Sequence, residues 1–239
     1  ESEIIQSGTQ HELSEKLKDF SVRMVLTAHP TQFYPGPVLG IINDLSRALS
    51  DNNTSQINVY LQQLGKTPFL NKKKPTPYDE AVSLIWYLEN VFYAAAGRII
   101  SFFKYQFPDV LNPNNPIVNM GFWPGGDRDG NPFVTADTTL QVADGLRGSI
   151  IKCYYLDVRR LKRRLTFKGV DTILASLEKQ LYNNIFIPGH RTEISTQEIL
   201  KALNNIRDIL IYQHNGLFLH LVDSLINKVE IFGLHFASL

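Results

Sequence analysis

Three short apolar segments, separated by roughly ninety to a hundred residues of mainly helical sequence, constrain the fold of this chain more than any other feature. They cover residues 23–27, 117–123 and 229–237, and each is rich in residues that favour strands. Short apolar segments of this kind are typical of strands buried in a parallel sheet or barrel. The intervening stretches are long enough for the crossovers that parallel strands require. We therefore predict a mainly α-helical protein with a few short parallel strands.

The spacing of apolar residues predicts helices between these segments. Pro77 suits the first turn of the longest one, with Thr76 as its N-cap residue and Asp79 near the positive end of the helix dipole. The body of that helix is apolar nearly all round, so we expect it to be buried. The predicted helices cover residues 10–20, 36–64 (two helices, broken at 51–54), 77–106, 135–167, 170–183, 195–213 and 216–229.

The composition describes a soluble globular protein, with 44% hydrophobic and 20% charged residues and a formal net charge of +1. This charge balance gives no argument for nucleic-acid binding, and no apolar run is long enough to span a membrane. A single cysteine, Cys153, excludes an internal disulfide and fits a reducing compartment, so we expect a cytoplasmic protein. The apolar ending, Glu230 to Leu239, predicts a chain that stops inside a buried element.

The loop after the first apolar segment carries a histidine. It reads Thr-Ala-His-Pro-Thr-Gln over residues 27–32, which places His29 just beyond a predicted strand. In barrel enzymes the loops at the C-terminal ends of the strands carry the chemistry. A histidine there is suited to act as a general acid or base, because its intrinsic pKa lies near neutrality. A lone histidine near a core is more often structural, so both interpretations stay open.

The loop after the second segment reads Trp-Pro-Gly-Gly-Asp-Arg-Asp-Gly-Asn-Pro over residues 123–132. Its glycines permit positive φ and a close approach of the backbone to a ligand. Arg128 offers a guanidinium fork suited to a phosphate or a carboxylate. Asp127 and Asp129 could orient that arginine or assist a metal. A salt-bridged turn between strand and helix is the structural alternative.

The same loop superficially resembles an EF-hand calcium loop. In an EF-hand the glycine stands at position six and a glutamate at position twelve. Counted from Asp127, Gly130 stands at position four and Thr138 at position twelve, so this interpretation fails. The basic run of residues 159–164 could contact phosphates, but a solvated helix face explains it better.

Taken together, the two loops resemble those of phosphoenolpyruvate carboxylase. Residues 27–32 and 123–132 carry motifs of that family about a hundred residues apart, and residues 74–81 are similar to a family segment between them. The tail at residues 232–234 resembles a segment before another barrel strand. The matches follow the family's order and span most of the chain.

Two departures from the family pattern indicate a divergent member of the bacterial type. Residues 34–37 stand where family members usually carry paired arginines. Residues 65–69 replace an expected Trp-x-Thr-Asp-Glu segment. Both departures concern anion binding around the first loop.

The resemblance implies a partial TIM-like α/β barrel embedded in many helices. Residues 1–239 would be a single incomplete portion of the catalytic unit, and inactive alone. The implied reaction joins bicarbonate to phosphoenolpyruvate, giving oxaloacetate and phosphate, with magnesium or manganese held by residues outside this chain. The implied assembly is a homotetramer of the intact enzyme, with self-association of the chain alone.

The resemblance also implies roles for single residues. His29 would be the essential histidine that handles the proton of carboxyphosphate. Trp123 would line an apolar wall near the methylene carbon of the substrate. The anion-binding floor would comprise Arg128, Asp127, Asp129 and Asn131. Two alternatives remain: a helical interaction module without catalysis, and a phosphate-ester hydrolase that uses His29 and Arg128.

Overall fold

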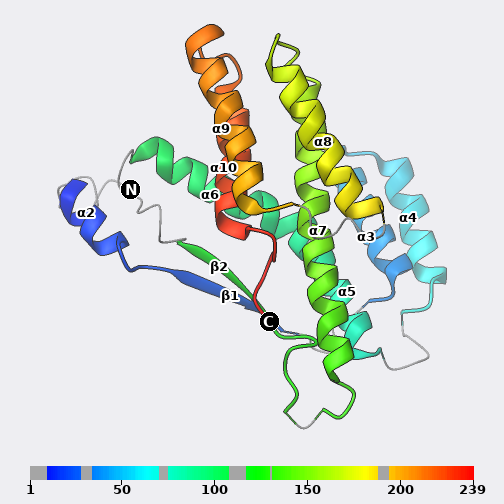
Figure 1. Cartoon of the computed structure of the whole chain (residues 1–239). Helices are drawn as coiled ribbons and strands as arrows, with labels where there is room; N and C mark the ends of the chain where they lie inside the picture. Colours follow the sequence, from blue (N-terminus) through cyan, green and yellow to red (C-terminus); the bar gives the residue numbers. More distant parts are fainter. Residues whose placement is uncertain (1–9, 28–33, 70–74, 108–116, 130, 188–193) are drawn as a thin grey trace.

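A computed structural model describes residues 10–27, 34–69, 75–107, 117–129, 131–187 and 194–239 (Figure 1). Within these ranges the protein is mainly helical, as predicted, and its two strands are parallel. The helices are α2 (Gln10–Leu17), α3 (Gly36–Ser50), α4 (Thr54–Lys66), α5 (Pro77–Tyr87), the π-helical turn η2 (Leu88–Phe92), α6 (Tyr93–Gln106), α7 (Ala136–Lys162), α8 (Val170–Phe186), α9 (Thr196–Gln213) and α10 (Leu219–Phe232). The strands are β1 (Val22–Leu26) and β2 (Val118–Phe122).

The predicted start of α5 is confirmed in detail. The Thr76 hydroxyl accepts a hydrogen bond from the Asp79 N–H at 3.2 Å, and the Thr76 N–H donates to the Asp79 carboxylate at 2.9 Å. The Thr76 hydroxyl also donates to this carboxylate at 2.7 Å, and that bond, together with the one from the Thr76 N–H, lowers the pKa of the Asp79 carboxyl, because both stabilise its charged form. Pro77 occupies the first turn, where its missing N–H has no cost.

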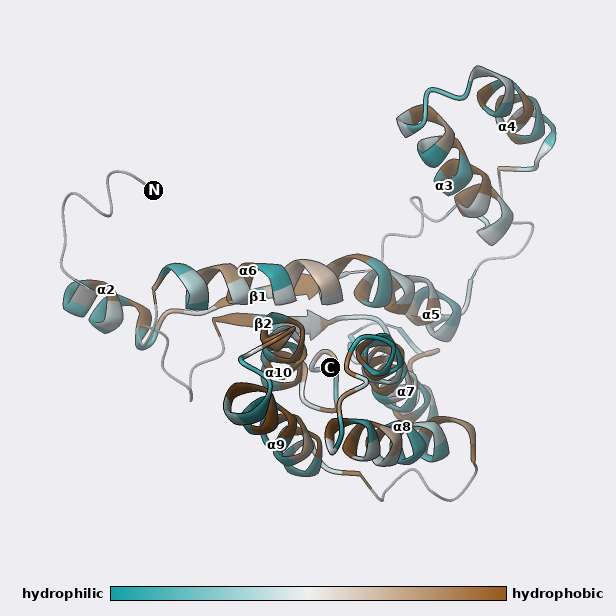
Figure 2. Cartoon of the chain, turned by 90° about the horizontal axis from the view of Figure 1, so that it is seen from above, coloured by the Kyte–Doolittle hydropathy of each residue, from teal (hydrophilic) through white to brown (hydrophobic). Residues whose placement is uncertain are grey.

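The prediction that the body of this helix, residues 85–103, is buried was wrong for one of its faces. One face of α5 and α6 packs on the core, while Trp86 remains 43% and Phe102 47% exposed on the other side. Figure 2 shows α5 and α6 lying across the group formed by α7, α8, α9 and α10, and α3 with α4 set apart from that group. An element that crosses a helix group on one side buries only the side chains that face it. The buried residues are Ala81, Ile85, Leu88, Tyr93, Ala96, Gly97 and Ile100.

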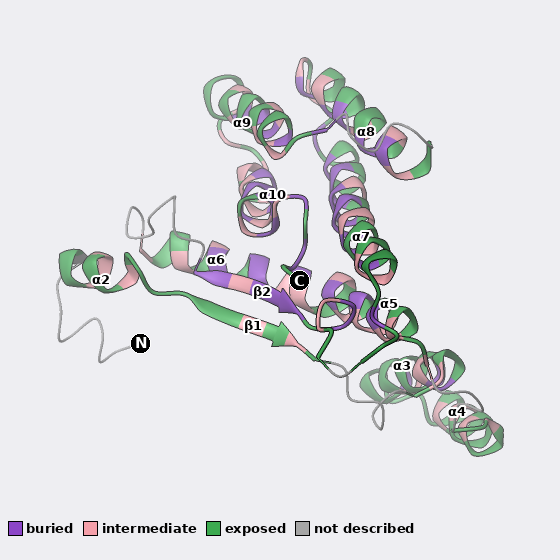
Figure 3. Cartoon of the chain, turned by 60° about the horizontal axis from the view of Figure 1, so that its bottom comes forward, coloured by how far each residue is buried: buried purple, intermediate pink, exposed green. Residues whose placement is uncertain are grey.

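The two strands pair in parallel with a register that joins Val22 to Val118 and Leu26 to Phe122. Strand β2 is almost wholly buried, as the sequence predicted, whereas β1 is exposed at Val22 and Val25 (Figure 3). The difference arises because β2 packs against α10 and is bridged at Gly121 by Ser238, whereas β1 pairs only with β2 among the described residues.

The prediction of a third strand over residues 229–237 was wrong, because residues 229–232 are helical and residues 233–237 form turns and a bend. Helix α10 continues to Phe232, and Gly233 ends it with a φ of +53°. The apolar residues recur at helical spacing, so the helical period outweighs the β propensity of single residues. At the end of the chain Ser238 forms an isolated parallel bridge with Gly121. The buried apolar residues of α10 are Val222, Leu225, Ile226, Val229 and Phe232.

The core of the helix group contains a cluster of aromatic rings around one carboxylate. Tyr93 lies against Phe232 and Tyr154, with ring centroids 5.8 and 6.2 Å apart. The Tyr93 hydroxyl donates a 2.8 Å hydrogen bond to the buried carboxylate of Asp157. Burial, and then the negative charge of Asp157, raise the pKa of Tyr93 well above 10.0.

No helix in the described ranges is long and apolar enough to cross a membrane.

This core predicts a loss of stability at alkaline pH. Burial also raises the pKa of Tyr154 and raises that of the Cys153 thiol to about 12. The folded chain therefore keeps these protons while the unfolded chain releases them, so the free energy of unfolding falls once the pH rises above the unfolded pKa values. Each of these groups lowers the free energy of unfolding by about 1.4 kcal/mol per pH unit in that range.

Urea unfolding across pH 8 to 11 measures this slope, and Tyr93→Phe should make it shallower by about 1.4 kcal/mol per unit above pH 10. Tyr105, which is 82% exposed on the same helix, gives the control variant Tyr105→Phe. If the free energy of unfolding depends on pH equally in wild type and Tyr93→Phe, Tyr93 does not have the raised pKa assigned to it.

Candidate functional site

The two motif-bearing loops begin side by side at one edge of the sheet. Leu26 and Phe122, the last residues of β1 and β2, are partners in the parallel register. Just beyond them, the Trp123 N–H donates a 2.8 Å hydrogen bond to the Leu26 carbonyl. Thr27 is exposed there, whereas His29, two positions later in the sequence, lies outside the described residues. The paired strands thus direct both loops from the same end of the sheet.

Short hydrogen bonds fold the second loop onto itself. The Gly126 N–H donates to the Trp123 carbonyl at 3.1 Å, which closes a turn. The Asp127 carboxylate accepts the Asp129 N–H at 3.0 Å, and the Asn131 side chain accepts the Phe133 N–H at 3.1 Å. Side-chain oxygens that accept backbone N–H groups two residues on are typical of Asx turns. Asp127 and Asn131 therefore stabilise the loop itself.

Gly125 fixes the loop to helix α7. Its φ of +79° lies in the region that favours glycine, and its carbonyl accepts a 2.7 Å hydrogen bond from the Thr139 hydroxyl. A Cβ at this position would lie 2.5 Å from a methyl carbon of the fully buried Val142. Only glycine allows the loop backbone to approach α7 so closely.

Gly125→Ala should therefore destabilise the fold by about 2 to 4 kcal/mol, combining backbone strain with overpacking of a core methyl group. Gly126→Ala is the matched control, because its Cβ would meet Leu239 at an ordinary 3.4 Å. Urea unfolding of both variants measures the difference. Equal stabilities of the Gly125→Ala and Gly126→Ala variants would show that the loop backbone can move away from α7 at little cost in free energy.

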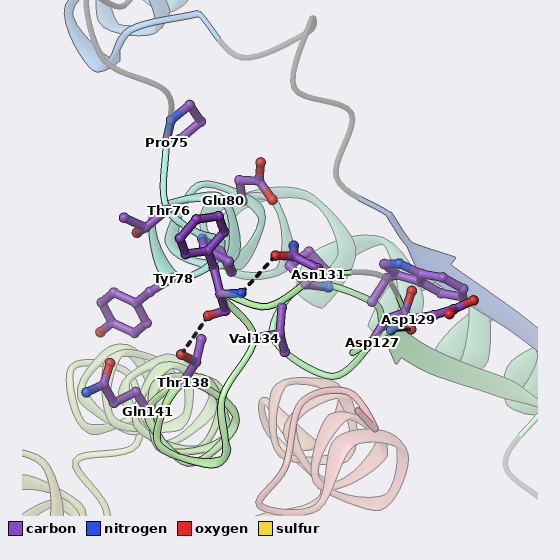
Figure 4. Close-up of a pocket in the computed structure, with 15 residues that line it drawn as sticks. Pro75, Thr76, Tyr78, Glu80, Asp127, Asp129, Asn131, Val134, Thr138 and Gln141 are labelled. Atoms are coloured by element: carbon purple, nitrogen blue, oxygen red, sulfur yellow. Dashed lines mark hydrogen bonds between the residues drawn. The ribbon is translucent and has the colours of Figure 1, made fainter.

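A cavity of about 680 Å³ opens beside this loop, between the N-terminal turns of α5 and α7 (Figure 4). Four of the residues predicted from the sequence line it: Trp123, Asp127, Asp129 and Asn131. Trp123 is 52% exposed, so its indole ring is available to a ligand. The size falls within the range of small-molecule sites.

Sequence reasoning missed the opposite walls of this cavity. Tyr78 and Glu80 of α5 and Thr138 and Gln141 of α7 line it together with the loop. The signal for the α5 residues was the segment of residues 74–81, which resembles a family segment but suggested no site residue by itself. The α7 residues gave no signal, because their position depends on how α7 packs against α5.

The described lining is acidic. Glu80, Asp127 and Asp129 contribute carboxylates, and no Lys, Arg or His belongs to the described lining residues. The structure does not bring Arg128 into that lining: its side chain is exposed, and neither neighbouring aspartate is ion-paired with it among the described residues. An anionic ligand held here needs cations from the undescribed loops, from Arg128 after a rearrangement, or from another chain segment.

Comparison with known proteins identifies the family. The sequence model of the phosphoenolpyruvate carboxylase family matches residues 3–186. Phosphoenolpyruvate carboxylase of Shewanella oneidensis is 26% identical over 96% of this chain and 31% of its own length. The Gloeobacter violaceus protein of that name is 24% identical over 95% of this chain and 31% of its own length. That of Prochlorococcus marinus is 30% identical over 70% of this chain.

The chain thus spans about a third of the length of the curated relatives it matches. The family match includes both motif segments, the segment of residues 74–81 and all of α7 and α8. The two sequence motifs, the parallel pairing of the strands that precede them and the family match agree. The chain belongs to the phosphoenolpyruvate carboxylase family.

Proposed function

We propose that this chain carries two active-site loops of an enzyme that joins bicarbonate to phosphoenolpyruvate, giving oxaloacetate and phosphate. The parallel pairing of Leu26 with Phe122 carries this proposal, because it starts both family motifs at one sheet edge. In α/β barrels that edge is where catalytic loops gather. The proposal includes a partial TIM-like barrel in which β1, β2 and the bridge at Ser238 are successive parallel strands.

The proposed reaction begins when a bicarbonate oxygen attacks the phosphorus of phosphoenolpyruvate. The bond between phosphorus and the enol oxygen breaks, which leaves the enolate of pyruvate and carboxyphosphate. His29 would accept the carboxyphosphate proton, so that carboxyphosphate separates into carbon dioxide and phosphate. The enolate methylene carbon then attacks carbon dioxide and forms oxaloacetate.

The residues of the second loop would position the substrate. Trp123 has a half-exposed indole that lines the cavity and would offer an apolar wall to the methylene carbon. Arg128 would bind the phosphate or the carboxylate through its guanidinium fork. Asp127 and Asn131 would hold the loop in shape through their hydrogen bonds to backbone N–H groups.

The proposed metal, magnesium or manganese, is not accommodated by the described residues. These contain no group of three or more His, Cys, Asp or Glu side chains placed to hold a metal ion. We therefore assign no step of the reaction to a metal in this chain, and we place the ligands elsewhere in the longer protein.

The remaining proposals concern assembly and location. The intact enzyme would be a cytoplasmic homotetramer without nucleic-acid or membrane partners. The chain alone would self-associate, because within the described ranges β1 is paired on one side only and exposes Val22 and Val25.

A coupled assay on purified residues 1–239 tests the proposed division of the active site. We expect no oxaloacetate from phosphoenolpyruvate, bicarbonate and magnesium, because catalysis requires the whole set of groups in register and the chain covers about a third of its relatives. The full-length polypeptide is the positive control. Turnover by the short chain would contradict this division, and phosphate release without bicarbonate would support a phosphate-ester hydrolase.

A further inference from the structure

A second cavity, of about 490 Å³, lies between the C-terminal turns of α7 and helix α10. Four cationic side chains line it, together with one carboxylate, that of Asp157. The cations are Arg160, Arg163, Arg164 and Lys228. Cavities that concentrate one sign of charge attract ions of the opposite sign. The cavity is distant from the second loop, because Thr139, which contacts that loop, and Arg160 lie 21 positions apart along α7, or roughly 30 Å.

The floor of this cavity is built from buried groups. The Lys228 side chain is only 15% exposed, and its ammonium donates to the Asp157 carboxylate at 2.8 Å. The same ammonium lies 4.6 Å from the centre of the Tyr93 ring. The Lys228 stem packs on Gly97, where a Cβ would lie 2.7 Å from its Cε. The lysine is therefore held in one place by α6, α7 and the aromatic core.

The arginines at the rim differ from other cations of the same basic run. Arg159 and Lys162 face α8 and form ion pairs with Glu178 at 3.6 and 2.7 Å. Arg163 and Arg164 line the cavity instead, and within the described part of the chain neither forms an ion pair. Arg160 shares the Asp157 carboxylate with Lys228, so one buried anion serves two cations. The cavity has an excess of positive charge that the described residues leave uncompensated.

We propose that this cavity is a binding site for a small-molecule phosphate monoester, separate from the active site. Guanidinium forks match the oxygens of a phosphate, and three arginines at and just after the C-terminal end of α7 line this cavity with a lysine of α10. The cavity volume falls within the range of small-ligand sites, which favours a metabolite over a macromolecule. Asp157 would position Arg160 and Lys228, while Arg163 and Arg164 would contact the phosphate from the rim.

Calorimetric titration of residues 1–239 with glycerol phosphate and with inorganic phosphate, at constant ionic strength, tests the proposal. We expect saturable binding that weakens at least about tenfold in the Arg163→Gln/Arg164→Gln double variant. The matched control is Arg159→Gln/Lys162→Gln, which removes the same charge from the same basic run, residues 159–164, but spares the cavity. That control should change the affinity less than about twofold.

Three outcomes would overturn the proposal. Equal weakening in both double variants would mean diffuse attraction to a basic surface. Tighter binding of a dicarboxylate, such as succinate, would assign a different ligand class. Absence of saturable binding, or binding only to vesicles that contain phosphatidic acid, would exclude a small-molecule phosphate site. A shift of Arg160 and Lys228 side-chain NMR signals by glycerol phosphate would locate the ligand independently of the variants.

Discussion

His29→Asn in the full-length polypeptide is expected to lower oxaloacetate formation by about 10²–10⁴-fold, the usual contribution of a general base. Bicarbonate-dependent phosphate release should fall much less, because phosphoryl transfer to bicarbonate precedes the proton transfer assigned to His29. Asparagine preserves polarity and approximate size but cannot accept a proton at neutral pH. Parallel assays of oxaloacetate and phosphate measure the two steps separately.

The control for this variant is His220→Asn, which changes an exposed histidine on α10. It should leave both rates within about twofold of wild type, as expected of a surface substitution. If His29→Asn also keeps its oxaloacetate rate, the proposed role of His29 is wrong.

Asp157→Asn is expected to destabilise the fold by about 3 kcal/mol or more. It removes the negative charge that holds Lys228 and Arg160, and it leaves an ammonium in a nearly buried position. Removing one partner of a buried ion pair is much more costly than losing an exposed pair. Urea unfolding near neutral pH measures the change.

The matched control is Asp223→Asn on α10, whose carboxylate pairs with Arg207 at 2.9 Å with both side chains about two-fifths exposed. Its loss should cost about 1 kcal/mol or less. Adding Lys228→Met to Asp157→Asn should restore part of the lost stability, because the unpaired charge is then removed. Similar losses for Asp157→Asn and Asp223→Asn would indicate that Asp157 is well hydrated in solution.

Local signals in the sequence were sufficient for most helices. Thr76, Pro77 and Asp79 fix the start of α5 through bonds within four residues, so no tertiary information is needed. Residues 229–232 were misassigned because their aliphatic and aromatic side chains suit both strands and helices. The helical spacing of the apolar residues from Val222 to Phe232 was the local signal against a strand, and the packing of α10 against α6, α7 and α9 uses that spacing.

The residues that line the cavity could be predicted only where they are contiguous in the sequence. Trp123, Asp127, Asp129 and Asn131 belong to one loop, and the structure places all of them along one cavity. The walls from α5 and α7, and the exposure of Arg128, depend on packing between elements that the sequence does not specify. The exposed faces of β1 and α6 were unpredictable for the same reason: an apolar side chain is compatible with burial, but whether another element covers it depends on the tertiary packing.

The central claim is that these loops serve the carboxylation of phosphoenolpyruvate. Incubation of the full-length polypeptide with phosphoenolpyruvate and carbon-13 bicarbonate tests it most directly, with oxaloacetate and phosphate measured together. We predict label in the new carboxyl group and one phosphate released for each oxaloacetate formed. Phosphate release that does not depend on bicarbonate, without labelled oxaloacetate, would contradict the claim.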